Sequence, residues 1–236
     1  MPTPRRDSPP VSTIRSTRPV LRPVSRDSVQ DRIYAELCDA LICGRLQGGQ
    51  TLQIRALAAT FHTSVMPVRE ALRRLVAEGA LESSTQRPVR VPSMTPQRLD
   101  DIFQARLLVE GRAAEMAAAN VDDDLLARLE KADAAFCEAL ANPDPDAELT
   151  ANREFHFTLY AASGSPALLA IIRSLWLQTG PFLRLAVERH RPEEVGPRTL
   201  YHHDVMQALR AKDAAATRRA LEADLSWSLN LLKQGA

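Results

Sequence analysis

The sequence predicts a mainly α protein in two parts, a small N-terminal helical domain that includes a β-hairpin and an all-α antiparallel bundle behind it. Ala and Leu are plentiful, while aromatic residues make up only 5% of the 236 residues. This composition favours helices over sheets. Apolar residues recur at helical spacing along most of the chain. The exception is a pair of short segments on either side of residue 86, which are typical of two strands joined by a turn.

The composition argues against a membrane-spanning or exported protein. No apolar run approaches the roughly 18 residues that a bilayer requires, and the Pro- and Arg-rich start lacks the apolar core of a signal peptide. The cysteines are Cys38, Cys43 and Cys137, an odd number without the spacing of a metal site. We therefore expect a reduced, cytoplasmic protein whose cysteines are small buried apolar residues.

The charge is distributed unevenly along the chain. Residues 1–95 contain 14 Lys and Arg against 8 Asp and Glu, whereas residues 96–236 contain 16 against 21. The overall net charge of +1 is therefore the sum of a basic N-terminal part and an acidic C-terminal part. This pattern favours a polyanionic partner for the front part only, although uneven surface charge without a partner is the alternative.

Residues 1–27 are predicted to form a disordered basic arm, because they combine six prolines with six arginines and offer little apolar surface to bury. Such an arm can touch DNA phosphates and speed encounter, or it can be a tail without a specific role. The arginines are Arg5, Arg6, Arg15, Arg18, Arg22 and Arg26.

The next part, residues 28–92, is predicted to be a compact helical domain. A helix over 28–43 ends at Gly44, and a short extended stretch follows at 51–53. Two amphipathic helices then flank a polar turn at 62–64. Ser64 is placed to cap the second of them, Pro67 lies in its first turn, and Gly79 ends it. Its apolar stripe is Val68, Ala71, Leu72 and Leu75.

Arginines lie off that stripe, at Arg69, Arg73 and Arg74. A helix that is supported by a partner and presents Arg outward meets the physical requirement for reading a DNA major groove. The alternative is an ordinary helical hairpin with a solvated charged face. Residues 81–83 and 89–91 are predicted to be two short strands with a turn at 84–88, and Arg87 and Arg90 are their expected phosphate-side charges.

This domain resembles the winged helix-turn-helix of the GntR family of bacterial transcription regulators. The resemblance covers about a quarter of the chain and includes the specific run PVREAL, followed by EG. The matching residues are Gly44-Arg45-Leu46, Gly48-Gly49, Leu52, Leu57-Ala58, Phe61, Ser64, Pro67-Val68-Arg69-Glu70-Ala71-Leu72, Leu75, Glu78-Gly79, Leu81 and 87–91.

The resemblance implies DNA contacts at Arg55, Ser64 and Arg69. Family members often have arginine directly after the cap, where this chain has Val65 and then Met66; Val65 can instead touch a thymine methyl group. Many relatives have glycine at the tip of the hairpin, where this chain has Gln86. The complete set of candidate DNA-contacting residues is Arg55, Ser64, Val65, Met66, Arg69, Arg73, Arg87 and Arg90.

After a linker at 93–97, residues 98–236 are predicted to be entirely helical. Four of the boundaries between the helices carry proline or glycine, at Pro143-Asp144-Pro145, Gly164, Gly180-Pro181 and Gly196-Pro197. The expected helices are 97–120, 122–141, 147–162, 166–179, 180–190, one from 196–197 to 212, and 213–233.

This helical part resembles the FCD ligand-binding domain of the FadR subfamily. The matching residues are Asp101, 106–110, Asn152-Arg153-Glu154-Phe155-His156, Gly164-Ser165-Pro166-Ala167-Leu168, His202 and Ala208-Leu209-Arg210-Ala211-Lys212-Asp213. The resemblance implies an all-α effector-binding and dimerisation domain.

Asn152 and His156 are four residues apart, so they share one face of a helix. The resemblance adds His202 and Asp224 to them as a metal site, with Asp224 where relatives usually have histidine. Such a set suits Zn²⁺, Mn²⁺, Fe²⁺ or Ni²⁺. The resemblance also implies that Arg106 holds the carboxylate of an acidic effector. The alternatives are hydrogen-bonded core histidines and a structural arginine; Glu110 is expected to be structural.

The leading functional prediction is a cytoplasmic, homodimeric transcription regulator, a repressor rather than an activator, that binds an operator in double-stranded DNA. A small organic acid, bound with a divalent metal ion, would control its DNA affinity. No nucleophile–base pair is evident, so an enzyme is not expected. The alternatives are an architectural DNA-binding protein without effector and a small helical metalloenzyme.

Overall fold

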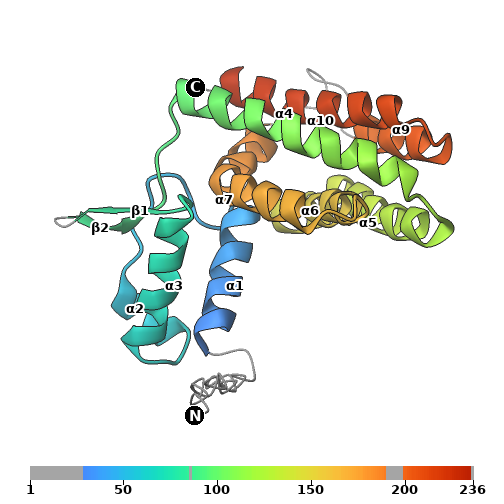
Figure 1. Ribbon diagram of the computed structural model, residues 1–236. Coiled ribbons are helices and arrows are strands. Elements are labelled where there is room, and N and C mark those ends of the chain that lie inside the picture. Colours follow the sequence, from blue (N-terminus) through green and yellow to red (C-terminus); the bar gives the residue numbers. More distant parts are fainter. Residues whose placement is uncertain (1–28, 85–86, 190–198, 235–236) are drawn as a thin grey trace, which may run out of the picture.

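The computed structural model describes residues 29–84, 87–189 and 199–234. Figure 1 shows two parts, a small head at the lower left and a helical bundle at the upper right. The predicted mainly α fold is confirmed. The predicted arm at 1–27 and the expected hairpin tip at Gln86 lie outside the described residues.

The head is built on three helices, α1 (Val29–Ile42), α2 (Ile54–Thr60) and α3 (Val65–Ala77). Helix α3 packs against both α1 and α2, because its apolar residues recur on one side. The apolar stripe predicted for α3 is buried. The polar turn before α3 includes His62, which has a φ of 50°. The buried side chains of α3 are Val68, Ala71, Leu72 and Leu75.

An antiparallel hairpin of β1 (Glu82–Ser84) and β2 (Arg87–Arg90) follows α3 and projects to the side in Figure 1. The expected strands at 81–83 and 89–91 were therefore misplaced by one or two residues, and the expected turn was too long. The hairpin is anchored to the stretch before α2, because the Leu52 amide donates to the Val89 carbonyl at 2.8 Å and Thr51 forms a bridge with Arg90.

The bundle contains six helices among the described residues. Figure 1 shows α4, α9 and α10 in an upper layer and α5, α6 and α7 below them. Helix α4 packs on α10, and α5 packs on α6. The bounds are α4 (Pro96–Ala119), α5 (Asp123–Ala141), α6 (Pro145–Ala161), α7 (Pro166–Arg189), α9 (Thr199–Arg210) and α10 (Ala214–Gln234).

Helix α6 begins two residues before the predicted start at 147. The Asp144 side chain caps it by accepting from the amides of Asp146 and Ala147. Pro145 is its first residue, where the missing N–H does no harm. The Pro-Asp-Pro sequence was therefore a start signal as well as a break.

Helix α7 corrects the prediction of two helices at 166–179 and 180–190. It is continuous through Pro181. Proline removes one backbone hydrogen bond and disfavours a helix interior, but tertiary packing overrides that preference here. Trp176, Leu177 and Leu183 are buried on both sides of the proline. Residues 190–198 lie outside the described part, so the expected helix end at 190 and the turn at 196–197 are not placed.

The head contacts the bundle through α1 and α7. Gly180 lies so close to the end of α1 that an added Cβ would be 2.2 Å from the Leu41 carbonyl oxygen and 2.6 Å from Ile42 Cα. Beside this contact, Asp39 on α1 is ion-paired with Arg153 on α6. Backbone proximity and a charge pair therefore join the two domains.

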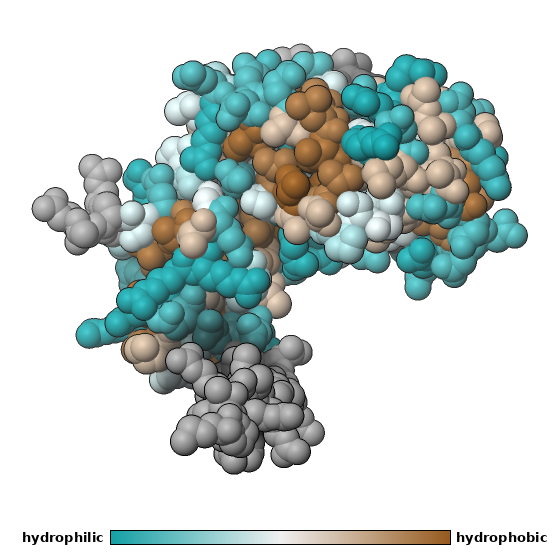
Figure 2. Space-filling model, in the orientation of Figure 1, coloured by the Kyte–Doolittle hydropathy of each residue, from teal (hydrophilic) through white to brown (hydrophobic). Residues whose placement is uncertain are grey.

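Hydrophobic residues gather on one face of the bundle, over the middle of α4 and the neighbouring part of α7 (Figure 2). The large exposed apolar residues on these helices include Leu108 and Ile171, at 66% and 49% exposure. Among the described helices, none has the length and apolar character needed to cross a bilayer.

Candidate functional site

The predicted DNA-contacting residues of the head lie together on α2, α3 and the turn between them. Arg55 is exposed at the start of α2, and Arg69 and Arg73 are exposed on α3. Met66 is 53% exposed and Val65 is half-buried. The outer side of α3 is therefore accessible to a duplex, as reading a major groove requires.

Ser64 occupies the predicted N-cap position of α3, but its side chain makes no capping hydrogen bond. The prediction that Ser64 is the N-cap residue is confirmed, but the expected capping hydrogen bond is absent. The residue is exposed, so its hydroxyl is not committed to the helix end.

The arginines of α3 differ in their partners. Arg73 pairs with Glu70 at 2.7 Å. Arg74 lies over the Tyr34 ring of α1, 3.6 Å from its centroid, and bonds Glu78 at 3.1 Å. Within the described part of the chain, Arg69 has neither an ion pair nor a hydrogen bond through its side chain. Of the three arginines of α3, Arg69 is therefore the one without a partner among the described residues.

The hairpin adds a second basic element beside α3. Arg90 on β2 pairs with Glu82, which lies opposite it on β1. Arg87 begins β2, but its side chain is outside the described part of the structure. A hollow of about 250 Å³ separates the hairpin from α3, and Arg69, Arg73 and Ser83 are among its lining residues. The two elements therefore border one surface.

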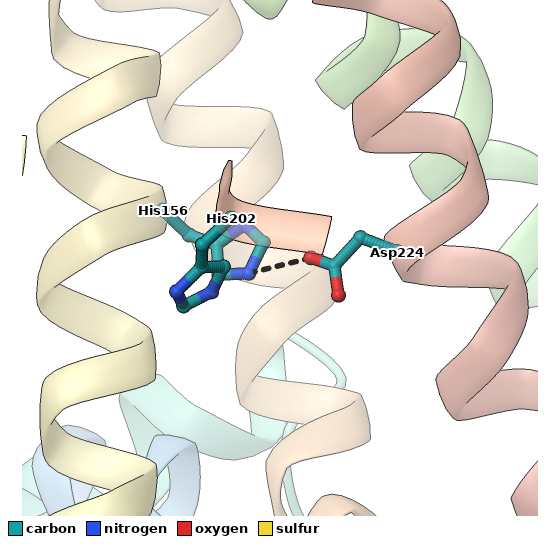
Figure 3. A group of neighbouring side chains, drawn as sticks. All are labelled: His156, His202 and Asp224. Atoms are coloured by element: carbon teal, nitrogen blue, oxygen red, sulfur yellow. Dashed lines mark ion pairs between the residues drawn. The ribbon is translucent and has the colours of Figure 1, made fainter. Parts of the chain in front are cut away.

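In the bundle, three of the four predicted metal ligands come together from three helices (Figure 3). His156 lies on α6, His202 on α9 and Asp224 on α10. One ligand atom from each lies within 4.8 Å of the others. The His156 Nε2 atom is 3.0 Å from Asp224 Oδ2. Asn152, the fourth, is half-buried one turn before His156 on α6.

The second nitrogen of each imidazole is held by another residue. His156 Nδ1 is 3.0 Å from the Tyr160 hydroxyl oxygen, and His202 Nδ1 is 3.0 Å from Asp133 Oδ1. Histidines that bind metals usually have the other ring nitrogen fixed in this way. The arrangement therefore fits a divalent metal ion.

Burial also suits the two histidines to this role. His202 stacks on the Phe155 ring with 3.8 Å between centroids, and His156 lies 5.4 Å from the Trp176 ring. Burial lowers the pKa of His202 below its ordinary value, so the ring favours the neutral form that binds a metal ion. Together with the Asp224 carboxylate, two imidazoles form a donor set for Zn²⁺, Mn²⁺, Fe²⁺ or Ni²⁺.

Arg106, the predicted effector anchor, is buried in an internal ion pair. It donates to Glu110 from Nε at 2.6 Å and from a terminal nitrogen at 3.2 Å, and its other terminal nitrogen contacts Thr179 at 3.4 Å. Glu110 also accepts from Tyr160 and from Trp176 Nε1. The fork that was expected to hold an effector carboxylate is therefore filled by Glu110 in this structure.

A groove of about 1000 Å³ runs between α5 and α6, away from these residues. Its lining includes Glu154 and Thr158, but none of the predicted metal ligands. Residues two apart on a helix point in nearly opposite directions, about 200° apart. The groove and His156 are therefore on different sides of α6.

Sequence reasoning missed the partners of the two histidines. The spacing of His156 and Tyr160, four residues apart, was a visible signal for one of these contacts. Asp133 lies on α5 and meets His202 only through tertiary packing, so no local pattern revealed it.

Two family models match the chain in succession. The model described as bacterial regulatory proteins, gntR family, matches residues 29–91, and the FCD domain model matches residues 101–226. These limits agree with the head and the bundle described above.

Curated relatives match most of the chain. The HTH-type transcriptional regulator McbR of Escherichia coli K12 is 31% identical over 203 residues, which are 86% of this chain and 92% of that protein. The HTH-type transcriptional repressor GlaR of the same strain is 28% identical, over 85% and 94% of the two chains. The gluconate operon transcriptional repressor of Bacillus licheniformis is 27% identical, over 90% and 93%.

Solved structures show the same architecture. E. coli McbR/YncC superposes with a TM-score of 0.84 at 30% identity, covering 89% of this chain and 99% of that one. A putative GntR regulator from Rhodococcus sp. RHA1 has a TM-score of 0.72 at 24% identity, over 88% and 98%. The second likeness concerns the fold alone.

Proposed function

Because the chain belongs to the gntR family of bacterial regulatory proteins and has an FCD domain behind its DNA-binding head, we propose that it is a homodimeric cytoplasmic repressor that responds to a small organic acid. Its family and relatives are transcription regulators and not enzymes, which removes the metalloenzyme alternative. The homodimer, the cytoplasmic location, the operator, the effector and the metal ion are all parts of this proposal.

The observation that carries the DNA-reading role is the exposed Arg69 on α3, which has no partner among the described residues. A duplex that receives α3 in its major groove meets this guanidinium, with the hairpin beside it on the sugar–phosphate backbone. We assign head and hairpin to residues 28–92, and dimerisation and effector binding to 98–236. The linker predicted at 93–97 is shorter in the structure, because α4 begins at Pro96. A two-fold dimer presents two such heads, so the operator is a pseudo-palindrome with matching half-sites.

Replacing Arg69 with alanine should weaken operator binding by about 1–3 kcal/mol, because it removes a contact to a base edge or phosphate. The measurement is fluorescence anisotropy with a duplex selected from random DNA by the full-length protein. Arg112→Ala is the matched control, because Arg112 is exposed on α4 of the bundle and pairs with Glu115. Equal affinities of the Arg69 variant and the wild type would remove the proposed contact.

The effector site is proposed at the cluster in Figure 3. His156, His202 and Asp224 would hold a divalent ion, with Asn152 as a further oxygen donor. The bound ion would supply an electrophilic centre for the carboxylate of an organic acid. Arg106 remains a candidate second anchor for that acid, provided that Glu110 releases the guanidinium. Loading of this site would shift the population of head orientations and thereby the operator affinity.

Purification without chelator should yield protein with a bound divalent ion, and adding Zn²⁺, Mn²⁺, Fe²⁺ or Ni²⁺ to stripped protein should raise its Tm. His156→Ala should abolish both effects. His203→Ala is the matched control, because His203 is the exposed neighbour of the buried His202. Metal-independent stability of the wild type would disprove the metal site.

A thermal-shift screen of organic acids with each metal ion then tests the effector. Acids that raise the Tm should also change operator affinity. If no acid and no metal ion alters DNA binding, the protein is an architectural DNA-binding protein, and the effector-controlled repressor is excluded.

A further inference from the structure

The buried polar chain around Glu110 fixes the direction of its hydrogen bonds. Glu110 is fully buried and is paired with the Arg106 guanidinium through both carboxylate oxygens. Trp176 Nε1, which can only donate, contacts Oε2 at 3.1 Å. An ionised carboxylate accepts hydrogen bonds and donates none. Every group that contacts Glu110, including the Tyr160 hydroxyl, must therefore donate to it.

This direction determines which nitrogen of His156 carries a proton. The Tyr160 hydroxyl has a single hydrogen, which it donates to Glu110. Towards His156 Nδ1, 3.0 Å away, the same oxygen can then only accept. His156 Nδ1 must therefore be the protonated nitrogen of the Tyr160 contact. By the same rule, Nε2, which lies 3.0 Å from Asp224 Oδ2, donates to that carboxylate in the protein without metal, and a bound ion would take the place of this hydrogen.

The same argument applies to His202, with a different partner. Asp133 Oδ1 lies 3.0 Å from His202 Nδ1, and a carboxylate accepts at this contact. The Asp133 side chain is 18% exposed, whereas the His202 side chain is 2% exposed. The carboxylate therefore keeps contact with solvent while it orients a buried ring.

We propose that Tyr160, backed by Glu110, and Asp133 are positioning residues that keep both histidines protonated at Nδ1, so that Nε2 is the nitrogen through which each ring would bind an ion. Tyr160 is four residues after His156 on α6, and Asp133 reaches His202 from α5. The role of these residues in metal binding rests on the proposed metal site. The protonation of Nδ1 itself is expected in the protein without metal as well.

The first test reads the ring protons directly. Nitrogen-15 NMR of the histidine side chains in stripped, full-length protein should show Nδ1 protonated in both His156 and His202. Tyr160→Phe should remove this preference at His156 alone, and Asp133→Ala at His202 alone. Wild-type rings that are unprotonated at Nδ1 would overturn the proposal, whether or not the protein binds metal.

The second test measures affinity for Zn²⁺ by calorimetry with a competing chelator. Tyr160→Phe and Asp133→Ala should each weaken binding by about 10–100-fold, the usual effect of losing such a partner. Asp133→Asn should recover much of the loss, because its amide oxygen still accepts from Nδ1. Unchanged affinity in both Tyr160→Phe and Asp133→Ala would overturn the positioning role.

Each variant has a matched control. Tyr34→Phe removes a similar tyrosine–glutamate bond, from Tyr34 to Glu78 at 2.7 Å, in the head. Glu130→Ala removes another α5–α9 contact, between Glu130 and Arg210 at 2.6 Å. Neither should alter Zn²⁺ affinity. If the wild type binds no metal but shows the expected Nδ1 protons, the proposed metal function fails and the assigned ring orientation stands.

Discussion

Replacing Glu110 with alanine is expected to lower the free energy of unfolding by about 3–5 kcal/mol, because it leaves a buried guanidinium without its carboxylate. Arg106 is 1% exposed and Glu110 is not exposed at all. Burial lowers the pKa of Arg106, but the Glu110 charge more than offsets this and keeps that pKa above its ordinary value. A guanidinium is not deprotonated in proteins, so Arg106 stays charged in the variant even without Glu110. Urea unfolding followed by circular dichroism measures the loss.

Two further variants separate the charge effect from other causes. In the double variant Arg106→Met, Glu110→Leu, both charges are absent, so the loss should be smaller than in Glu110→Ala alone. Glu115→Ala removes a carboxylate from the same helix, but its partner Arg112 is exposed, so a loss within about 1 kcal/mol is expected. A similarly small loss in Glu110→Ala would mean that the buried pair is not coupled as the distances indicate.

Replacing Gly180 with alanine should destabilise the protein by about 1–3 kcal/mol and loosen the head from the bundle, because the new methyl group has no space. It would lie 2.2 Å from the Leu41 carbonyl oxygen and 2.6 Å from Ile42 Cα, both backbone atoms of α1. Backbone cannot rotate away as a side chain can, so α1 must move. Calorimetry measures the loss of stability, and limited proteolysis at residues 93–95, before α4, measures the loosening of the head.

Gly111→Ala is the control for this substitution. Gly111 also lies inside a helix, but an added Cβ would meet side-chain atoms, Glu222 Oε1 at 3.0 Å and Arg218 Cγ at 3.4 Å. These side chains can move, and alanine favours a helix over glycine. If Gly180→Ala has the same Tm and the same resistance to proteolysis as Gly111→Ala, the domain contact tolerates a methyl group.

Local signals in the sequence were sufficient for most of the fold. The stripe around Leu72 and the stop at Gly79 placed α3, because a short helix is determined by its apolar side and its ends. The break predicted at Pro181 failed, because burial of Trp176 and Leu183 outweighs the lost backbone bond. Tertiary packing of this kind is not visible in a local pattern.

The candidate metal cluster was predictable only in part. Asn152 and His156 share a helix face by spacing alone, whereas His202 and Asp224 were identified through family resemblance. The contact between Asp133 and His202 joins α5 to α9, 69 residues apart. The pairing of Arg106 with Glu110 had a local signal, since the two residues are four apart. The resemblance instead favoured an external carboxylate for Arg106.

Adjacent residues on α6 serve both domains. Asn152 is the proposed fourth donor of the metal site, and Arg153 is ion-paired with Asp39 of α1. Neighbouring side chains on a helix are fixed about 100° apart, so rolling α6 about its axis moves both together. A roll that draws Asn152 towards an ion carries Arg153 along the surface of α1. If loading of the proposed site rotated α6, the same rotation would also shift the ion pair that α6 makes with α1 of the head.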